Sequence, residues 1–168
     1  DLDGVMVGER IGGLVGQNDG TIERSFANNR IVSGVDRIGG LVGQNSGSIT
    51  DSGARIGEDQ IPGSEVFTFE VTGRDDVGGL VGLNDGGTIK TSYAKRDTKG
   101  TGERIGGLVG NNTNGSIENT YAWGRVYSDV SDVSDASNVG NVGGLVGYNN
   151  NGSIINSYAY GEVISGAS

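Results

Sequence analysis

The pentapeptide Gly-Gly-Leu-Val-Gly occurs five times in the 168-residue chain and constrains the fold more than any other feature of the sequence. Self-similarity at a fixed period is typical of repeat architectures, in which each unit stacks on its neighbours. Taken from the aliphatic residue before each copy, the repeats cover residues 11–37, 38–76, 77–104, 105–141 and 142–168. We therefore predict a single repeat domain over residues 1–168, in which residues 1–10 are the tail of a preceding repeat.

The repeats share the same columns of residues. Each opens with an aliphatic residue followed by two glycines, namely Gly12 and Gly13, Gly39 and Gly40, Gly78 and Gly79, Gly106 and Gly107, and Gly143 and Gly144. The second residue after each pentapeptide is an asparagine, at Asn18, Asn45, Asn84, Asn112 and Asn149. We expect both columns to be structural. The glycines let neighbouring units approach closely, and stacked asparagines hydrogen-bond along the axis at the corners.

The composition favours an all-β fold. Glycine contributes 34 of the 168 residues, and each glycine inside a helix costs about 1 kcal/mol relative to alanine. A unit of about 27 residues buries too few apolar side chains to offset the entropy of ordering its backbone, so neighbouring units must stack. We predict a β-solenoid of about five such coils, and a stacked array of β-hairpins is the alternative. Because adjacent strand residues point to opposite faces, one of the Leu14 and Val15 columns is expected to face outward or to be covered.

Two insertions of about ten residues interrupt the second and fourth repeats, near residues 58–74 and 128–138. The first contains an alternating segment at residues 66–71, which predicts an extra strand or hairpin, with a binding loop as the alternative. The repeat alignment places both insertions after the same point of the unit, so we expect them to form one lateral surface. The second repeat also has Gly53 where the other repeats have an aromatic residue.

The residues that are missing exclude several functional classes. The chain has no cysteine and no histidine, which removes thiol nucleophiles, Ser-His-Asp triads and zinc sites built on those side chains. A net charge of −9 argues against nucleic-acid binding. No apolar run reaches the roughly 18 residues of a membrane-spanning helix. We predict a protein without enzymatic activity, catalytic residues or membrane insertion.

Two sets of residues are candidates for binding. We expect the Tyr column near the end of the repeats to be internal. Four other aromatic side chains fall outside that column, namely Trp123, Tyr127, Tyr148 and Tyr160. They are interpreted either as packing residues or as a contact surface for a glycan or protein. The second set, Asp129, Asp132 and Asp135, lies in the second insertion and predicts either a solvated acidic loop or a Ca²⁺ site. No other cofactor is expected.

The Gly-Gly-Leu-Val-Gly sequence, the following Asn and the closing Ile-x-x-Ser-Tyr-Ala resemble the GLUG motif of bacterial secreted and cell-surface proteins. The resemblance covers nearly the whole chain. It implies a non-catalytic structural or adhesive module, similar to parts of adhesin-like and filamentous-haemagglutinin-like proteins, at the cell surface or outside the bacterial cell. Such a module is an elongated scaffold that presents side loops to a protein or glycan on another cell or matrix. The alternative is a subunit of an extracellular filament, joined to identical subunits head to tail through open solenoid ends.

Overall fold

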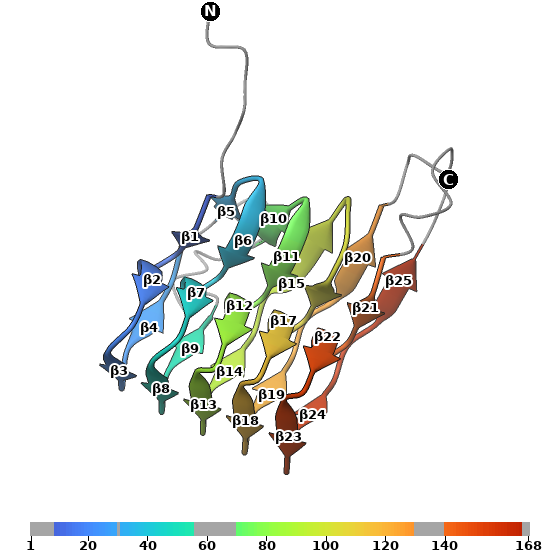
Figure 1. The fold of residues 1–168 in the computed structure, drawn as a ribbon. Helices are drawn as coiled ribbons and strands as arrows, with labels where there is room; N and C mark the ends of the chain where they lie inside the picture. The colour runs from blue at the N-terminus through green and yellow to red at the C-terminus, as the bar shows by residue number, and fades with distance from the viewer. Residues whose placement is uncertain (1–8, 30, 56–69, 130–139, 166–168) are drawn as a thin grey trace, which may run out of the picture.

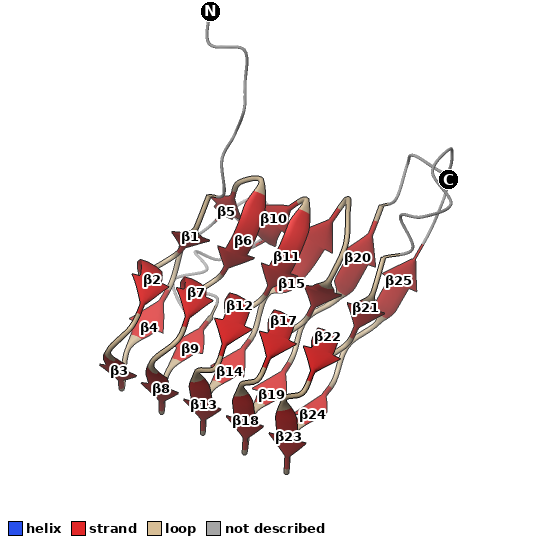
Figure 2. Cartoon of the chain, in the orientation of Figure 1, coloured by secondary structure: helices blue, strands red, loops and turns tan. Residues whose placement is uncertain are grey.

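The computed structural model describes residues 9–29, 31–55, 70–129 and 140–165, and the regular elements within them are all β-strands (Figure 2). The strands β1–β25 form five parallel sheets of five strands each. Five consecutive strands make one coil, and the coils lie side by side from the blue N-terminal coil to the red C-terminal coil (Figure 1). The predicted β-solenoid is therefore confirmed. The hairpin array is wrong, because hairpins pair their strands antiparallel.

The five sheets follow one another around each coil. The first sheet contains β1 (Ile11–Gly12), β6 (Asp36–Gly39), β11 (Asp75–Gly78), β16 (Ile105–Gly106) and β21 (Val142–Gly143). The second contains β2 (Val15–Asn18), β7 (Val42–Asn45), β12 (Val81–Asp85), β17 (Val109–Thr113) and β22 (Val146–Asn150). The third contains β3 (Thr21–Glu23), β8 (Ser48–Thr50), β13 (Thr88–Lys90), β18 (Ser116–Glu118) and β23 (Ser153–Ile155).

The last two sheets close the coil. The fourth contains β4 (Phe26–Ala27), β9 (Gly53–Ala54), β14 (Tyr93–Ala94), β19 (Tyr121–Ala122) and β24 (Tyr158–Ala159). The fifth contains β5 (Ile31–Ser33), β10 (Glu70–Gly73), β15 (Asp97–Gly100), β20 (Val126–Ser128) and β25 (Val163–Ser165). Neighbouring strands in a sheet are about 4.8 Å apart, so four steps separate the first and fifth coils by about 19 Å. The described stack of five coils is therefore short along its axis, and the elongated scaffold stays a prediction.

Strand register turns the sequence columns into ladders. Ile38 pairs with Ile11 in the preceding coil and with Val77 in the following one, and each opening glycine pairs with its equivalent. Two clusters of buried side chains run along the stack. The larger lies inside the second, third and fourth sheets and includes Leu80 and Ile89, and the smaller lies inside the first and fifth sheets and includes Val71 and Val126. The core is thus continuous from coil to coil.

The Leu and Val columns of the pentapeptide are both buried at the corner between the first and second sheets, although alternation along a strand would place them on opposite faces. Leu41 and Val42 are each fully buried and belong to the same core cluster. Strand β6 ends at Gly39 and β7 begins at Val42, so Leu41 lies in the turn between them. The prediction that one column faces outward or is covered from outside is wrong, because both columns are internal and alternation holds only within a continuous strand.

The second glycine of each pentapeptide lies where neighbouring coils touch. A Cβ atom placed on Gly40 would overlap the carbonyl oxygen of Gly79, and one on Gly79 would overlap that of Gly107. The Cβ of Ala54 lies on the other side of Gly40, at 2.8 Å from the same hypothetical Cβ atom. Glycine opposite alanine keeps this part of the coil thin, which explains the high glycine content at these positions.

The asparagine column forms a hydrogen-bonded ladder. The Nδ2 of each Asn donates to the Oδ1 of its equivalent in the next coil, over 2.7 Å from Asn18 to Asn45, 2.8 Å from Asn45 to Asn84, and 2.7 Å from Asn84 to Asn112 and from Asn112 to Asn149. The Nδ2 of Asn84 also donates to the carbonyl of Gly87 in the same turn, over 3.0 Å. The expected ladder is therefore present, and it has a direction, with its amide donors toward the C-terminal end.

A second corner, between the third and fourth sheets, holds one residue per coil in the left-handed region. These residues are Arg24, Asp51, Thr91, Asn119 and Asn156, with φ between 48° and 53°. The Ser or Thr that follows each of them stabilises the turn. Ser92, for example, donates from Oγ to the carbonyl of Lys90 over 2.7 Å and accepts the N–H of Ser52 over 3.1 Å. The tight corner thus recurs in every coil.

The two insertions leave the coil at different points. The first lies between β9 and β10, after the fourth sheet, and the second lies between β20 and β21, after the fifth sheet. The expectation of one lateral surface from a common point is therefore wrong. Residues 70–73, which the sequence places in the first insertion, form the regular strand β10, and Val71 pairs with Val32 and Thr98. Residues 66–69 of the predicted extra strand lie outside the described part of the chain.

Candidate functional site

An aromatic ladder runs along the outer face of the fourth sheet. Its rungs are Phe26, Tyr93, Tyr121 and Tyr158, and the alanine after each of the first three is buried. The ring centroids of Tyr93 and Tyr121 are 5.3 Å apart, those of Tyr121 and Tyr158 are 5.5 Å apart, and both pairs are tilted by only 10°. The Tyr column therefore faces outward, and the expectation that it is internal is wrong. Alanine faces the thin core and the ring faces outward.

The second coil leaves a gap in this ladder at Gly53. A Cβ atom placed there would lie 2.7 Å from the Cζ of Tyr93, so the Tyr93 ring leans over the glycine. The rings of Phe26 and Tyr93 are 6.2 Å apart across the gap. The guanidinium of Arg55 lies over the Phe26 ring, with its Cζ 4.7 Å from the centroid. A cation thus contributes to the aromatic surface where the aromatic rung is missing.

A second outward column lies two residues beyond each aromatic rung. Its members in chain order are Asn28, Arg55, Lys95, Trp123 and Tyr160. Backbone hydrogen bonds extend the sheet to these positions, since the N–H of Lys95 donates to Ala54 over 2.8 Å and that of Trp123 donates to Ala94 over 2.7 Å. Residues two apart in a strand point to the same face. The second column therefore lies beside the aromatic ladder.

The C-terminal part of this column is aromatic and the preceding part is cationic. The rings of Trp123 and Tyr160 are 5.0 Å apart and tilted by 52°, and these side chains are 56% and 66% exposed. The Nζ of Lys95 lies 5.3 Å from the Tyr93 centroid and 5.9 Å from the Tyr121 centroid. We call this surface the aromatic face; it comprises Phe26, Arg55, Tyr93, Lys95, Tyr121, Trp123, Tyr158 and Tyr160.

Several cations form no ion pair with a described residue, and two of them, Arg55 and Lys95, belong to the aromatic face. Within the described residues, neither Arg55 nor Lys95 lies within 4.0 Å of a carboxylate oxygen. Ion pairs do form on other surfaces, for example between Lys90 and Glu118, whose Nζ and Oε2 are 3.0 Å apart. Among the described residues, the aromatic face therefore carries positive charge without a neighbouring acid, in a chain whose net charge is −9.

The four aromatic residues predicted to bind a partner do not form one site. Trp123 and Tyr160 meet on the aromatic face. Tyr127 lies on the fifth sheet, where its hydroxyl accepts a hydrogen bond from Nη1 of Arg125 over 2.8 Å. Tyr148 is 41% exposed on the second sheet, in register with Asn111. The sequence analysis missed Arg55 and Lys95, although their position two residues after the aromatic column indicates the same face.

The predicted calcium site is only partly within the described residues. Asp132 and Asp135 lie outside them. The N–H of Asp129 donates to the carbonyl of Gly100 over 2.9 Å, continuing the fifth sheet by one residue. In the described ranges, no group of three or more acidic side chains is arranged to hold a metal ion. Binding of Ca²⁺ by the second insertion stays a prediction.

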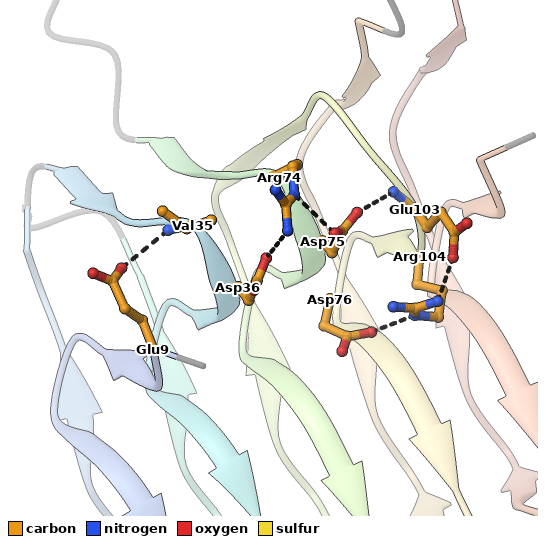
Figure 3. A network of polar contacts seen from close by, with 8 residues as sticks. All are labelled: Glu9, Val35, Asp36, Arg74, Asp75, Asp76, Glu103 and Arg104. Carbon is orange, nitrogen blue, oxygen red and sulfur yellow. Dashed lines mark hydrogen bonds and ion pairs between the residues drawn. The ribbon is translucent and has the colours of Figure 1, made fainter. Parts of the chain in front are cut away.

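A charged corner between the fifth and first sheets has a structural role (Figure 3). Arg74 spans two coils, donating to Asp75 over 2.9 Å and to Asp36 over 3.1 Å. Arg104 donates from Nε to Asp76 over 2.6 Å and also contacts Glu103. Burial raises the pKa of the Asp76 carboxyl, and the hydrogen bond from Arg104 opposes this effect. The side chains at this corner are paired with one another and join successive coils.

One arginine is buried beside the base of the first insertion. Arg96 is 1% exposed, and its Nη2 donates to the carbonyl of Arg55 over 3.1 Å. Burial lowers the pKa of Arg96 to about 10. Its equivalents in the next two coils are Gly124 and Gly161, and its Nη2 also donates to the carbonyl of Ala27 over 3.4 Å. We interpret Arg96 as a structural residue that links the third coil to the first two.

Three of the five coils match a known family of sequence repeats. The family model described as the GLUG motif matches residues 7–32, 101–127 and 138–164. The chain therefore carries three GLUG repeats. Each GLUG match covers most of one coil, namely the first, fourth and fifth, and the second and third coils pair in register between them. Searches of curated proteins and of solved structures gave no match. Among the described residues of the GLUG-repeat chain, no helix is long and apolar enough to cross a membrane.

Proposed function

We propose that this GLUG-repeat chain is a non-catalytic adhesive module of a bacterial surface or secreted protein. The observation that supports the proposal is the aromatic face, where exposed rings and two cations without a neighbouring described acid lie on a continuous parallel sheet. Exposed aromatic patches on a rigid support are typical of interaction surfaces. The stacked coils hold this surface rigidly, and a partner on another cell or matrix binds to it.

The regular face of the solenoid is favoured over the insertions as the contact surface. The insertions leave the coil at different points, whereas the aromatic face repeats in register from β4 to β24. The first insertion begins directly after Arg55, which itself belongs to the aromatic face. A partner bound there therefore lies close to the start of that insertion.

Adhesion of coated beads tests this function. Beads that carry the wild-type chain are added to layers of bacterial or epithelial cells and to extracellular matrix, and bound beads are counted after washing. We expect beads with the wild-type chain or the Tyr148→Ala control to adhere, and beads with the double variant Trp123→Ala and Tyr160→Ala to be lost. The side chains of Trp123, Tyr148 and Tyr160 are all exposed, so the variants should fold. Absence of adhesion by the wild-type chain to every surface would contradict the proposal.

A second candidate function is head-to-tail assembly of identical chains. The fifth coil exposes residues whose equivalents are buried in the middle of the stack, including Ile154 at 39% and Val163 at 48%. The asparagine ladder is polar, with the amide of Asn149 at one end and the Oδ1 of Asn18 at the other. A C-terminal coil therefore complements an N-terminal coil and not another C-terminal coil, as a heterologous interface requires.

Sedimentation velocity over a range of concentrations tests this second candidate. We expect the wild-type chain to form larger species as its concentration rises, and Ile154→Lys to remain monomeric. Thr50→Lys is the matched control, because it places the same charge on the lateral surface, in register with Lys90. A wild-type chain that stays monomeric at every concentration excludes assembly through the open coils.

A further inference from the structure

We propose that the aromatic face binds an acidic polysaccharide whose chain lies along the solenoid axis. This inference rests on the proposed adhesive function and names the chemistry of the partner. The ligand class is a linear polymer of pyranose rings that carry carboxylates, such as a polyuronate. Three properties of the aromatic face support it: its repeat, its charge and the orientation of its rings.

The repeat of the face matches a repeating polymer. An aromatic side chain recurs at four of the five coils, and the ring centroids of Tyr93, Tyr121 and Tyr158 follow one another at 5.3 and 5.5 Å. A surface that presents similar groups at regular steps can hold several units of a linear polymer at once, and linked contacts of this kind raise the overall affinity. A single small molecule would use only one or two of these rungs.

The charge of the face selects an acidic ligand. Arg55 and Lys95 lie in adjacent coils on the same outward column, and no described carboxylate pairs with either of them. The net charge of −9 over the whole chain would repel a polyanion from most of the surface. A carboxylated polymer is therefore attracted to the column where these two cations lie in adjacent coils, which orients it along the aromatic face.

The orientation of the rings distinguishes a sugar polymer from other polyanions. Tyr93, Tyr121 and Tyr158 stack on one another, so they present ring edges and hydroxyl groups to solvent. Trp123 and Tyr160 are tilted by 52° and are more than half exposed, which leaves ring surface for the apolar C–H face of a pyranose. The phenol hydroxyls supply hydrogen bonds to sugar hydroxyls beside this platform.

A nucleic acid is a poorer match. Single strands bind in positively charged grooves that follow the whole backbone, with a phosphate at every nucleotide. The aromatic face offers two cations, and the C-terminal half of its outer column carries none. A polyuronate needs fewer cations, because its pyranose rings bind the aromatic side chains directly.

Binding of polygalacturonate to the immobilised chain, measured by biolayer interferometry, tests the proposal. The comparison polymers are its methyl ester, which keeps the pyranose rings without the charge, and polyglutamate, which keeps the carboxylates without the rings. We expect polygalacturonate to bind and both comparison polymers to bind at least about tenfold more weakly. Raising the salt concentration should weaken the binding of polygalacturonate, because exposed charge pairs are screened.

Variants locate the binding on the aromatic face. The double variant Trp123→Ala and Tyr160→Ala and the double variant Arg55→Gln and Lys95→Gln should each lose about tenfold in affinity for polygalacturonate. Tyr148→Ala and Lys90→Gln are the matched controls on other sheets and should bind as the wild-type chain does. Circular dichroism establishes that each variant is folded.

Three results would overturn the proposal. They are binding of the methyl ester or polyglutamate as strongly as polygalacturonate, wild-type affinity in either double variant, and stronger binding of poly-dT than of polygalacturonate. Bead adhesion separates the ligand class from the function. If beads adhere through the aromatic face but polygalacturonate neither binds nor competes, the ligand class is wrong and the adhesive function stands. If polygalacturonate binds but the beads never adhere, the adhesive function is wrong.

Discussion

The ring of Tyr93 occupies the space that a side chain at position 53 would need. A Cβ atom on Gly53 would lie 2.7 Å from Cζ of Tyr93, and the aromatic ladder skips the second coil at this point. Because the ring is the outer end of a half-buried side chain, it can swing back into line with Tyr121. The gap is therefore a local feature of the surface and not a constraint of the core.

Filling the gap with Gly53→Tyr should stabilise the fold. The new ring would stack between Phe26 and Tyr93, and an aromatic pair contributes about 0.5–1.5 kcal/mol beyond the area it buries. We expect the free energy of unfolding to rise by about 1 kcal/mol, measured by chemical denaturation. Gly53→Ala is the control, since it changes the backbone entropy without adding a ring. A less stable Gly53→Tyr variant would show that the ladder cannot accept a fifth rung.

Gly79 is predicted to tolerate no side chain. A Cβ atom there would overlap the carbonyl oxygen of Gly107 in the next coil, and only separation of the coils would relieve the clash. We expect Gly79→Ala to lower the free energy of unfolding by about 3 kcal/mol or more. Gly20→Ala is the matched control, because a Cβ atom at Gly20 has no neighbour within 4 Å. Thermal denaturation of the two variants gives the comparison, and similar melting temperatures would contradict this account.

Columns of identical residues could be predicted from the sequence because stacking places equivalent residues side by side. The asparagine ladder from Asn18 to Asn149 follows directly from the repeat. The direction of neighbouring side chains was harder to predict, since it depends on where a strand ends. Leu41 and Val42 are both internal because the chain turns between Gly39 and Val42, and the Gly-Gly pair before Leu41 does not by itself show where the strand ends.

The candidate site was only partly predictable for the same reason. Trp123 and Tyr160 could be grouped because they occupy the same position of successive repeats. Their neighbours Arg55 and Lys95 occupy that position too, but they are recognised as part of a surface only when the Tyr column is known to face outward. The small alanine after each tyrosine is the signal, since Ala94 faces the glycine-lined interior and leaves the ring of Tyr93 to the outside.

Thr98 places a hydroxyl group in an aliphatic ladder. It pairs with Val71 and Val126, it is fully buried, and its Oγ1 has no hydrogen-bond partner among the described residues. An unsatisfied buried polar group costs about 1–3 kcal/mol. We expect Thr98→Val, which has nearly the same shape, to raise the free energy of unfolding by about 1–2 kcal/mol. Thr98→Ser keeps the hydroxyl and should lower stability, so a stabilised serine variant would contradict the explanation.

Asp76 should make stability depend on pH. Burial raises the pKa of its carboxyl above the ordinary value of 3.8, so the folded chain holds this proton more tightly than the unfolded chain. The contribution of Asp76 is fully present below pH 3.8 and is lost as the pH rises through the folded-state pKa. Asp76→Asn should remove this component, and the fifth coil already carries Asn141 at the equivalent position. Denaturation of both proteins as a function of pH measures the effect, and parallel curves would rule it out.

Thr91 has an unfavourable backbone conformation for a β-branched residue. Its φ is 48°, in the left-handed region, where the equivalent residues of the next two coils are Asn119 and Asn156. Asparagine tolerates this region far better than threonine does, because its side chain is unbranched at Cβ and bonds to the local backbone. We expect Thr91→Asn to raise the free energy of unfolding by about 1 kcal/mol and Asn119→Thr to lower it by a similar amount. Because Thr91 is exposed, packing should change little, and chemical denaturation of the reciprocal pair isolates the backbone effect. If both variants changed the free energy of unfolding in the same direction, the left-handed backbone at this corner would not be the cause.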